Sequence, residues 1–126
     1  MKQIETHAGG LDVIELSCKV PFPVQRIYWL RDTPVDATRG LHAHRTLRQV
    51  LVLVSGNVRV ELDNGHTTTV HKLDVDNPQL PIEPVTWRVL SEFGAGTVLM
   101  VLASAPYDPD DYIRDYSTFL AVARAS

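Results

Sequence analysis

Residues 39–56, RGLHAHRTLRQVLVLVSG, decide the fold of this chain. His42 and His44 are separated by one residue, so on a strand both imidazoles leave the same face. Four residues separate His44 from Gln49, and six separate Gln49 from Gly56. The intervening run is β-branched and aliphatic, which predicts a strand that ends at the glycine.

This spacing resembles the first motif of the cupin superfamily, in which two histidines are followed by a glutamate and then a glycine. Gln49 stands where that family usually has the glutamate. Cupins are jelly-roll (double-stranded β-helix) barrels, so the resemblance implies an all-β fold. It also implies that Gln49, Leu51 and Leu53 face inward from the strand after the histidine pair.

The rest of the chain has the pattern of many short strands. In residues 58–62, apolar and charged side chains alternate, which is the period of a half-buried strand. Asp63-Asn64-Gly65 then predicts a tight turn. Further strands are predicted over residues 12–19, 24–30, 67–70, 87–90 and 97–102. Short strands with frequent turns are typical of an antiparallel sandwich or barrel.

Only the tail predicts a helix. Asp108 is a suitable cap and Pro109 a suitable first residue for a helix that continues through Tyr112. The apolar side chains at helical spacing predict packing onto the barrel; they are Tyr112, Tyr116, Phe119 and Leu120. The sequence therefore predicts a single cupin domain over residues 1–126 with a short C-terminal helical segment.

Composition excludes several classes of function. With 126 residues, 44% hydrophobic and 21% charged, the chain predicts one ordered globular domain. A net charge of −3 gives no basic field for nucleic acid or anionic lipid. Cys18 is the only cysteine, which excludes a disulfide framework and a multi-thiolate metal site. With no membrane-length apolar run and no signal-like N-terminus, the sequence predicts a cytoplasmic protein.

A metal site of the cupin type is disfavoured by two positions. In metal-binding cupins, the two histidines, the glutamate and a third histidine hold one divalent ion. Here the glutamate position is Gln49, and residues 83–88 place Arg88 where the third histidine belongs. Arginine does not lose its proton in a protein and cannot ligate a metal. Because His66 follows a turn and His71 is predicted at a polar strand end, both are expected to be exposed, and we expect no metal and no cofactor.

Without an ion, the histidine pair is free for proton transfer. A model imidazole has a pKa of about 6.5, and two neighbouring rings resist double protonation. This predicts one neutral and one cationic ring, which suits a reaction that moves a proton between neighbouring carbons. Nucleophilic hydrolysis is disfavoured, because Cys18 has no recognisable partner and no serine lies in an activating motif.

A closer resemblance covers residues 24–120. It rests on Arg39-Gly40-Leu41-His42-Ala43-His44, on Gln49, on Trp87-Arg88, on the segment from Leu102 to Tyr107, and on Asp111-Tyr112-Ile113-Arg114-Asp115-Tyr116 with Phe119. This combination resembles the sugar 3,4-ketoisomerase family of cupins. The resemblance implies an isomerase that moves the carbonyl of dTDP-4-keto-6-deoxyglucose from C4 to C3 through an enediol. The product serves deoxy- and amino-sugar synthesis for lipopolysaccharide, O-antigen or antibiotics. The family uses no metal or cofactor, and is usually a homodimer with exchanged N-terminal strands.

The resemblance also implies roles for individual residues. His42 and His44 carry the proton transfers, with Arg39 in the same region as part of the catalytic set. Arg114 is a candidate for phosphate or sugar contact. Developing charge on oxygen requires a donor, for which Arg39 and Gln49 are candidates.

Further candidates for substrate binding follow from charge and aromaticity. The diphosphate requires positive charge, and the candidate arginines are Arg26, Arg31, Arg59, Arg88 and Arg114. Trp87 is a candidate for stacking on the sugar or thymine, and equally for the core. Tyr28 is a further substrate-binding candidate.

Three other functions remain as alternatives. One is a 3,5-epimerase acting on the same nucleotide sugar, another a metal-dependent cupin oxygenase or isomerase, and the third a non-catalytic sugar-binding cupin. The stereochemistry at C4 of the product, and which histidine is the base, stay open at this point.

Overall fold

The computed structural model describes residues 2–16 and 19–125, and Cys18 lies outside the described residues. The elements in chain order are β1 (Lys2–Thr6), β2 (Gly9–Val13), β3 (Arg26–Leu30), β4 (Arg39–His44), β5 (Gln49–Ser55), β6 (Val58–Asp63), β7 (Thr68–Leu73), β8 (Gln79–Ile82), β9 (Trp87–Ser91), β10 (Val98–Ala103), the 3-10 turn η1 (Pro109–Asp111), β11 (Tyr112–Ile113) and α1 (Tyr116–Arg124).

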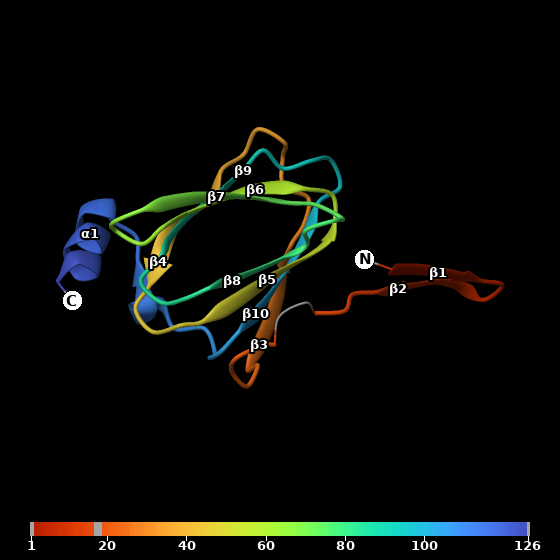
Figure 1. Cartoon of the computed structure of the whole chain (residues 1–126), viewed down its shortest axis with the longest axis horizontal. Helices are drawn as coiled ribbons and strands as arrows, with labels where there is room; N and C mark the ends of the chain where they lie inside the picture. The colour runs from red at the N-terminus through yellow and green to blue at the C-terminus, as the bar shows by residue number, and fades with distance from the viewer. Residues whose placement is uncertain (1, 17–18, 126) are drawn as a thin grey trace.

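Two antiparallel sheets face each other and form the barrel (Figure 1). One sheet has the order β3-β10-β5-β8 and the other the order β11-β4-β9-β6-β7. Aliphatic side chains from both sheets fill the space between them, among them Leu51, Val60 and Leu99. The predicted all-β jelly-roll with a short C-terminal helix is confirmed. Within the described part of the chain, the helical segments are too short to serve as a membrane span.

Strand β5 is apolar on both faces because both faces are covered. Leu51 and Leu53 point into the main core, as expected from the sequence. Val50 and Val52 point outward, where they contact the segment before β3, including Phe22. A strand buried on both sides has a continuous apolar run instead of an alternating one.

The turn between β6 and β7 is fixed by its glycine. Gly65 has a φ of +92°, and the side chain of Asp63 accepts a hydrogen bond from its N–H at 2.7 Å. A Cβ atom at Gly65 would lie 2.6 Å from the Cβ of Ala123. Arg124 also donates to the carbonyl of Gly65 at 2.8 Å, so helix α1 packs directly against this hairpin.

The predicted start of the helix is wrong. Pro109 begins only a single 3-10 turn, whose cap is Asp108, and Tyr112 then pairs as a strand with His44 of β4. Helix α1 starts at Tyr116, after the N-cap Asp115. The pairing with β4 satisfies backbone groups that a continuous helix would leave exposed on that sheet edge. The predicted packing of the helix is confirmed at Phe119, whose ring centroid is 5.7 Å from that of Trp87.

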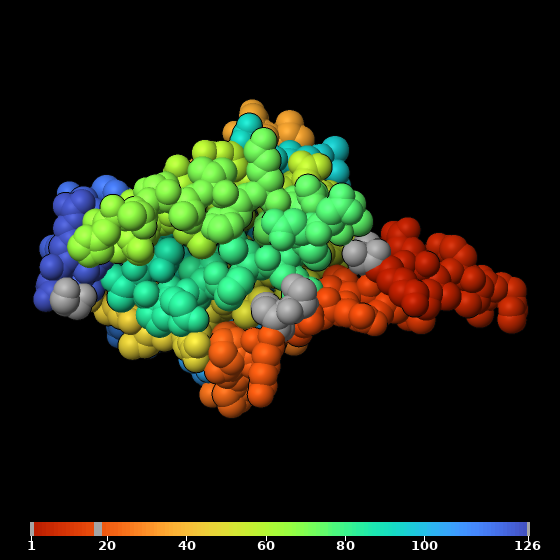
Figure 2. Space-filling view, viewed as in Figure 1, coloured from red at the N-terminus to blue at the C-terminus, as the bar shows by residue number. Residues whose placement is uncertain are grey.

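The N-terminal hairpin of β1 and β2 stands apart from the barrel. It forms its own two-stranded sheet and extends away from the other elements (Figures 1 and 2). Most of its residues are exposed, and Leu11 is 54% exposed. The strand predicted over residues 12–19 ends at Val13, and positions 17 and 18 of that prediction lie outside the described residues.

Candidate active site

The barrel encloses a cavity of about 390 Å³ between its two sheets. Among the described residues that line it, four are arginines and none is an aspartate or glutamate. The arginines are Arg26 on β3, Arg39 on β4, Arg88 on β9 and Arg114 after β11. Positive charge without a counter-ion in a partly enclosed cavity favours an anionic ligand.

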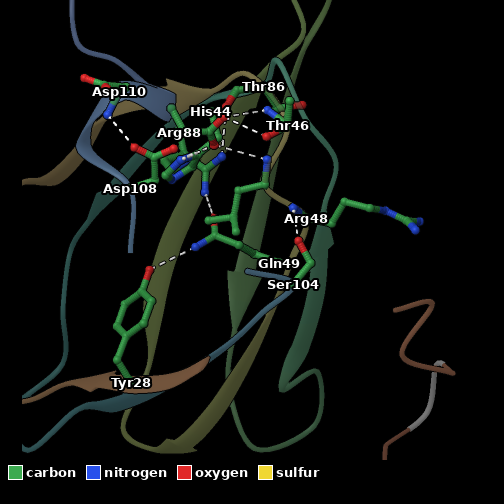
Figure 3. Close-up of polar contacts among 12 residues, drawn as sticks. Tyr28, His44, Thr46, Arg48, Gln49, Thr86, Arg88, Ser104, Asp108 and Asp110 are labelled. Carbon is green, nitrogen blue, oxygen red and sulfur yellow. Dashed lines mark hydrogen bonds and ion pairs between the residues drawn. The ribbon is translucent and has the colours of Figure 1, made fainter. Parts of the chain in front are cut away.

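A chain of hydrogen bonds crosses the inner end of this cavity (Figure 3). The guanidinium of Arg88, which is 3% exposed, donates to the side-chain oxygen of Gln49 and to the carbonyl of Thr86 at 3.1 Å. The Nε2 of Gln49 then donates to the hydroxyl of Tyr28 at 2.9 Å. The two positions that differ from metal-binding cupins therefore bind each other. Burial lowers the pKa of Arg88 to about 10, so the guanidinium remains charged at neutral pH.

His42 and His44 lie side by side on β4, with ring centroids 4.9 Å apart and the rings nearly perpendicular. His42 lines the cavity, whereas His44 is 1% exposed and lies deeper. The Nδ1 of His42 is 3.0 Å from the carbonyl oxygen of Gly40. Because a carbonyl only accepts, this hydrogen bond requires the proton on Nδ1 and leaves the lone pair on Nε2. His42 is therefore held in the tautomer of a base.

Both rings are neutral at pH 7, so the prediction of one cationic ring is wrong. Burial, and then the charge of Arg88, lower the pKa of His42 to about 4. Burial, Arg88 and His42 together lower the pKa of His44 to about 3. The positive charge of the site lies on Arg88 because an arginine holds its proton far more strongly than an imidazole.

Strand β11 contributes a tyrosine that was predicted to lie on a helix. The ring of Tyr112 is 5.0 Å from that of His42 and 4.4 Å from that of His44. The guanidinium of Arg114 also lies over this ring, 4.3 Å from its centroid. Its place in the 111–116 motif, which already pointed to the site through Arg114, is the signal that could have identified Tyr112.

The structure places Trp87 outside the cavity. Along β9 the side chains alternate, so Arg88 and Leu90 point inward while Trp87 points outward. There Trp87 packs against Tyr116 and Phe119, with centroid distances of 5.3 and 5.7 Å. The predicted substrate contact of Trp87 is therefore wrong, and its alternative role in the core is confirmed.

Of the five candidate arginines, two lie away from the cavity. Arg31 pairs with its neighbour Asp32 at 2.6 Å, and Arg59 is 3.5 Å from Glu92. Arg31 follows the end of β3 and Arg59 lies on β6, and neither side chain lines the cavity. Arg26, Arg88 and Arg114 remain as candidates for an anion.

Two of the remaining histidines are distant from the site. His66 is exposed as predicted. His71 lies within β7 and is half-buried, with its Nε2 2.9 Å from the hydroxyl of Thr69, so its predicted exposure is wrong. Among the residues described, no three histidine, cysteine, aspartate or glutamate side chains are grouped to hold a metal ion.

Comparison with known proteins matches residues 1–124 to the family described as "FdtA: WxcM-like, C-terminal". A TDP-4-oxo-6-deoxy-alpha-D-glucose-3,4-oxoisomerase from Aneurinibacillus thermoaerophilus is 40% identical over 120 residues, which cover 94% of this chain and 85% of the relative. The crystal structure of QdtA, a sugar 3,4-ketoisomerase from Thermoanaerobacterium thermosaccharolyticum in complex with TDP, is 36% identical with a TM-score of 0.84, and covers 98% of this chain and 90% of that chain.

A 3,4-ketoisomerase from Helicobacter canadensis is also 36% identical, with a TM-score of 0.82, and the match covers 97% of this chain and 92% of that chain. QdtA has in addition been solved as a histidine-to-asparagine variant in complex with TDP-4-keto-6-deoxyglucose. The similarity to sugar 3,4-ketoisomerases therefore extends over nearly the whole chain.

Proposed function

Because this chain belongs to the FdtA (WxcM-like, C-terminal) family, we propose that it is a nucleotide-sugar 3,4-ketoisomerase that moves the carbonyl of TDP-4-keto-6-deoxyglucose from C4 to C3. The relatives are ketoisomerases, so the 3,5-epimerase and the non-catalytic sugar-binding alternatives are not favoured. The enzyme is an isomerase, and the cytoplasmic location stays a prediction.

One observation carries this proposal furthest. A neutral histidine in the tautomer of a base, His42, lines a cavity that four arginines make positive. The ring supplies a proton acceptor, and the arginines supply charge for a diphosphate and for a developing oxyanion. A reaction that only moves protons needs these two elements and no redox cofactor.

The proposed reaction has three proton transfers. The C4 carbonyl acidifies the C3 proton, which Nε2 of His42 removes as the C3–H electron pair forms the C3–C4 double bond. The carbonyl electrons move to O4, and the resulting enediolate is stabilised by the charge of Arg88. The O3 proton then moves to O4. The electrons left on O3 form the C3 carbonyl, and the C3–C4 double bond takes the proton back from His42 at C4.

The other site residues have distinct proposed roles. Arg26, Arg39 and Arg114 provide the charge for the diphosphate. Gln49 and Tyr28 orient Arg88 and offer polar groups to the sugar hydroxyls. His44, in contact with the ring of His42, takes part in returning the proton.

A homodimer with exchanged N-terminal strands is part of the proposal. It is supported by the β1–β2 hairpin, which extends away from its own barrel (Figure 1). It is also supported by the outer face of β3, where Ile27 and Trp29 are 52% and 56% exposed. Large apolar side chains that are exposed together on one sheet face are suited to covering by a second copy of the chain. Sedimentation equilibrium should give twice the chain mass, and deletion of residues 2–13 should give a monomer. A monomeric full-length chain would refute the exchange.

The proposed reaction is tested in deuterated water with a chelator present. The protein is incubated with TDP-4-keto-6-deoxyglucose and followed by proton NMR. A carbonyl at C3 with deuterium at C4 is expected. Deuterium at C5 without carbonyl migration would indicate an epimerase, and ligand binding without exchange would indicate a binding protein.

Variants connect the reaction to the histidine pair. His42→Asn and His44→Asn should each slow the exchange by on the order of 100-fold, because a positioned acid or base contributes at least this much. His66→Asn is the matched control, since His66 is exposed and outside the cavity. Full activity in His42→Asn would remove this ring from the mechanism.

A further inference from the structure

Asp111 lies beside His44, at the turn that leads into β11. It ends the 3-10 turn η1, and the next residue, Tyr112, pairs with His44 across β11 and β4. This register places Oδ2 of Asp111 3.3 Å from Nδ1 of His44. Among the described residues, this buried Nδ1 has no hydrogen bond of standard geometry, and the carboxylate of Asp111 is its ion-pair partner. The fold therefore places the carboxylate of Asp111 next to Nδ1 of His44.

The carboxylate is held in place by the turn after β4. Its Oδ1 accepts hydrogen bonds from the N–H and the hydroxyl of Thr46, at 2.9 and 2.8 Å, and its Oδ2 accepts one from the N–H of Leu47 at 3.1 Å. Burial raises the pKa of Asp111, but these hydrogen bonds outweigh it and hold the pKa below its usual value. Asp111 is therefore an ionised acceptor with fixed orientation.

Asp111 does not line the main cavity. Together with His44 and Thr46 it lines a separate cavity of about 50 Å³, which shares Arg26 and Tyr112 with the main cavity. Asp111 therefore acts through His44, whose ring contacts that of His42 at the wall of the main cavity.

We propose that Asp111 is a positioning residue for His44: its carboxylate accepts the Nδ1 proton and holds the ring in the tautomer whose Nε2 carries the lone pair. A neutral imidazole has two tautomers, and an acceptor at Nδ1 selects this one. The carbonyl of Gly40 does the same for His42. Both rings then present Nε2 as a proton acceptor. The importance of this tautomer for turnover rests on the proposed function, whereas the tautomer itself does not.

The tautomer is measured directly by ¹⁵N–¹H long-range correlation NMR on wild-type protein at pH 7. His44 is expected to carry its proton on Nδ1. In Asp111→Asn, the amide NH₂ takes the place of Oδ2 and donates to Nδ1, so the proton should move to Nε2. A wild-type His44 protonated on Nε2, or a tautomer that is unchanged in Asp111→Asn, would overturn the proposal.

Kinetics distinguish positioning from structural support. Asp111→Asn should lower kcat by on the order of 100-fold with little change in KM, because the wrong tautomer removes an acid–base group without removing substrate contacts. Asp115→Ala is the matched control. It removes the N-cap of α1, whose side chain lines neither cavity, so it should lower the melting temperature and keep kcat close to wild type.

A double variant completes the test. If Asp111 acts through His44, Asp111→Asn should not lower kcat further in a His44→Asn background, while its effect on melting temperature persists. An equal fall of kcat in both backgrounds would show a purely structural role. If His44→Asn keeps full activity while wild-type His44 has the expected tautomer, the positioning by Asp111 stands and the proposed role of His44 in turnover is wrong.

Discussion

Lowering the pH from 7.5 to 5.5 should leave the isomerase activity almost unchanged. His42 accepts a proton only when it is neutral, so activity is lost as the pH falls through its pKa. Burial, and then the charge of Arg88, lower this pKa to about 4, and the hydrogen bond to Gly40 only partly opposes them. The acid limb of the pH profile should therefore lie far below that of an ordinary histidine.

The size of the effect follows from the two pKa values. At pH 5.5 a ring with a pKa of about 4 is ~97% neutral, whereas one with the ordinary value of about 6.5 is ~9% neutral. The ratio of kcat/KM at pH 5.5 to that at pH 7.5 is then about 1 for the first ring and about 0.1 for the second. The ten-fold difference is easily measured.

The assay is the initial rate of carbonyl migration between pH 4.5 and 8, at substrate concentrations well below KM so that kcat/KM reports the free enzyme. Circular dichroism at each pH, and recovery of activity after return to pH 7.5, separate titration from unfolding. Because the two histidines interact, the measured values belong to the pair. An acid limb with an apparent pKa of 6 or higher, on folded protein, would refute the reasoning.

The remaining predictions concern stability, backbone geometry and metals. The free energy of unfolding should fall as the pH drops from 6.5 toward 4, because His42 binds a proton in the unfolded chain but not in its buried place in the folded one. His42→Asn should make the free energy of unfolding, measured by urea titration, depend less on pH, and an unchanged pH dependence would contradict this. Phe119→Ala should cost about 3–5 kcal/mol in urea unfolding, since Phe119 is fully buried between the barrel and α1, and a loss below 1 kcal/mol would argue against this packing. Gly40→Ala should lower both stability and kcat, because Gly40 has a φ of +85° and a Cβ would lie 2.9 Å from the carbonyl oxygen of Arg88; an active and equally stable variant would exclude this constraint. Dialysis against EDTA should leave the initial rate unchanged, because Arg88 and Gln49 are not metal ligands of useful strength, and a loss of rate that Mn²⁺ or Zn²⁺ restores would refute this.

The strands were predictable where a local pattern had one structural solution. The aliphatic run of β5 and the alternation of β6 depend only on which faces are buried, and the Asp63-Asn64-Gly65 turn is specified by a positive φ at Gly65. Each of these features depends on residues that are consecutive in the sequence. The barrel followed from them and from the spacing of the histidines.

The start of the C-terminal helix could not be predicted from local sequence, because the residues from Asp108 onward are compatible with two structures. Asp108 and Pro109 start a 3-10 turn as readily as an α-helix. The choice was made by a non-local interaction, the pairing of Tyr112 with His44 on β4. Asp115 is the N-cap of α1, and it is an aspartate like Asp108, which was predicted as the cap.

The residues that form the site could be predicted from the sequence, but the protonation of the two histidines could not. Motif spacing identified His42, His44, Gln49 and Arg88, and the structure brings these four together. With Arg88 pointing inward, strand alternation already implied that Trp87 points outward. The protonation of the rings could not be predicted, because it depends on burial and on the distance to a cation from another strand.

Arg88 connects the charge of the site to its proposed chemistry. At two positions where metal-binding cupins have metal ligands, this chain has Gln49 and Arg88, and the guanidinium of Arg88 donates a hydrogen bond to Gln49. The positive charge is therefore part of the protein itself. Burial is the main cause that lowers the pKa of both histidines, and the charge of Arg88 adds to it, so both rings are neutral at pH 7. The same charge stabilises an enediolate once the proton has left C3. Burial lowers the pKa of Arg88 only to about 10, so the cation persists across the whole range in which the rings are neutral. In the proposed mechanism, one buried cation thus adds to the effect of burial that keeps the rings unprotonated before the reaction, and it balances the negative charge that forms during it.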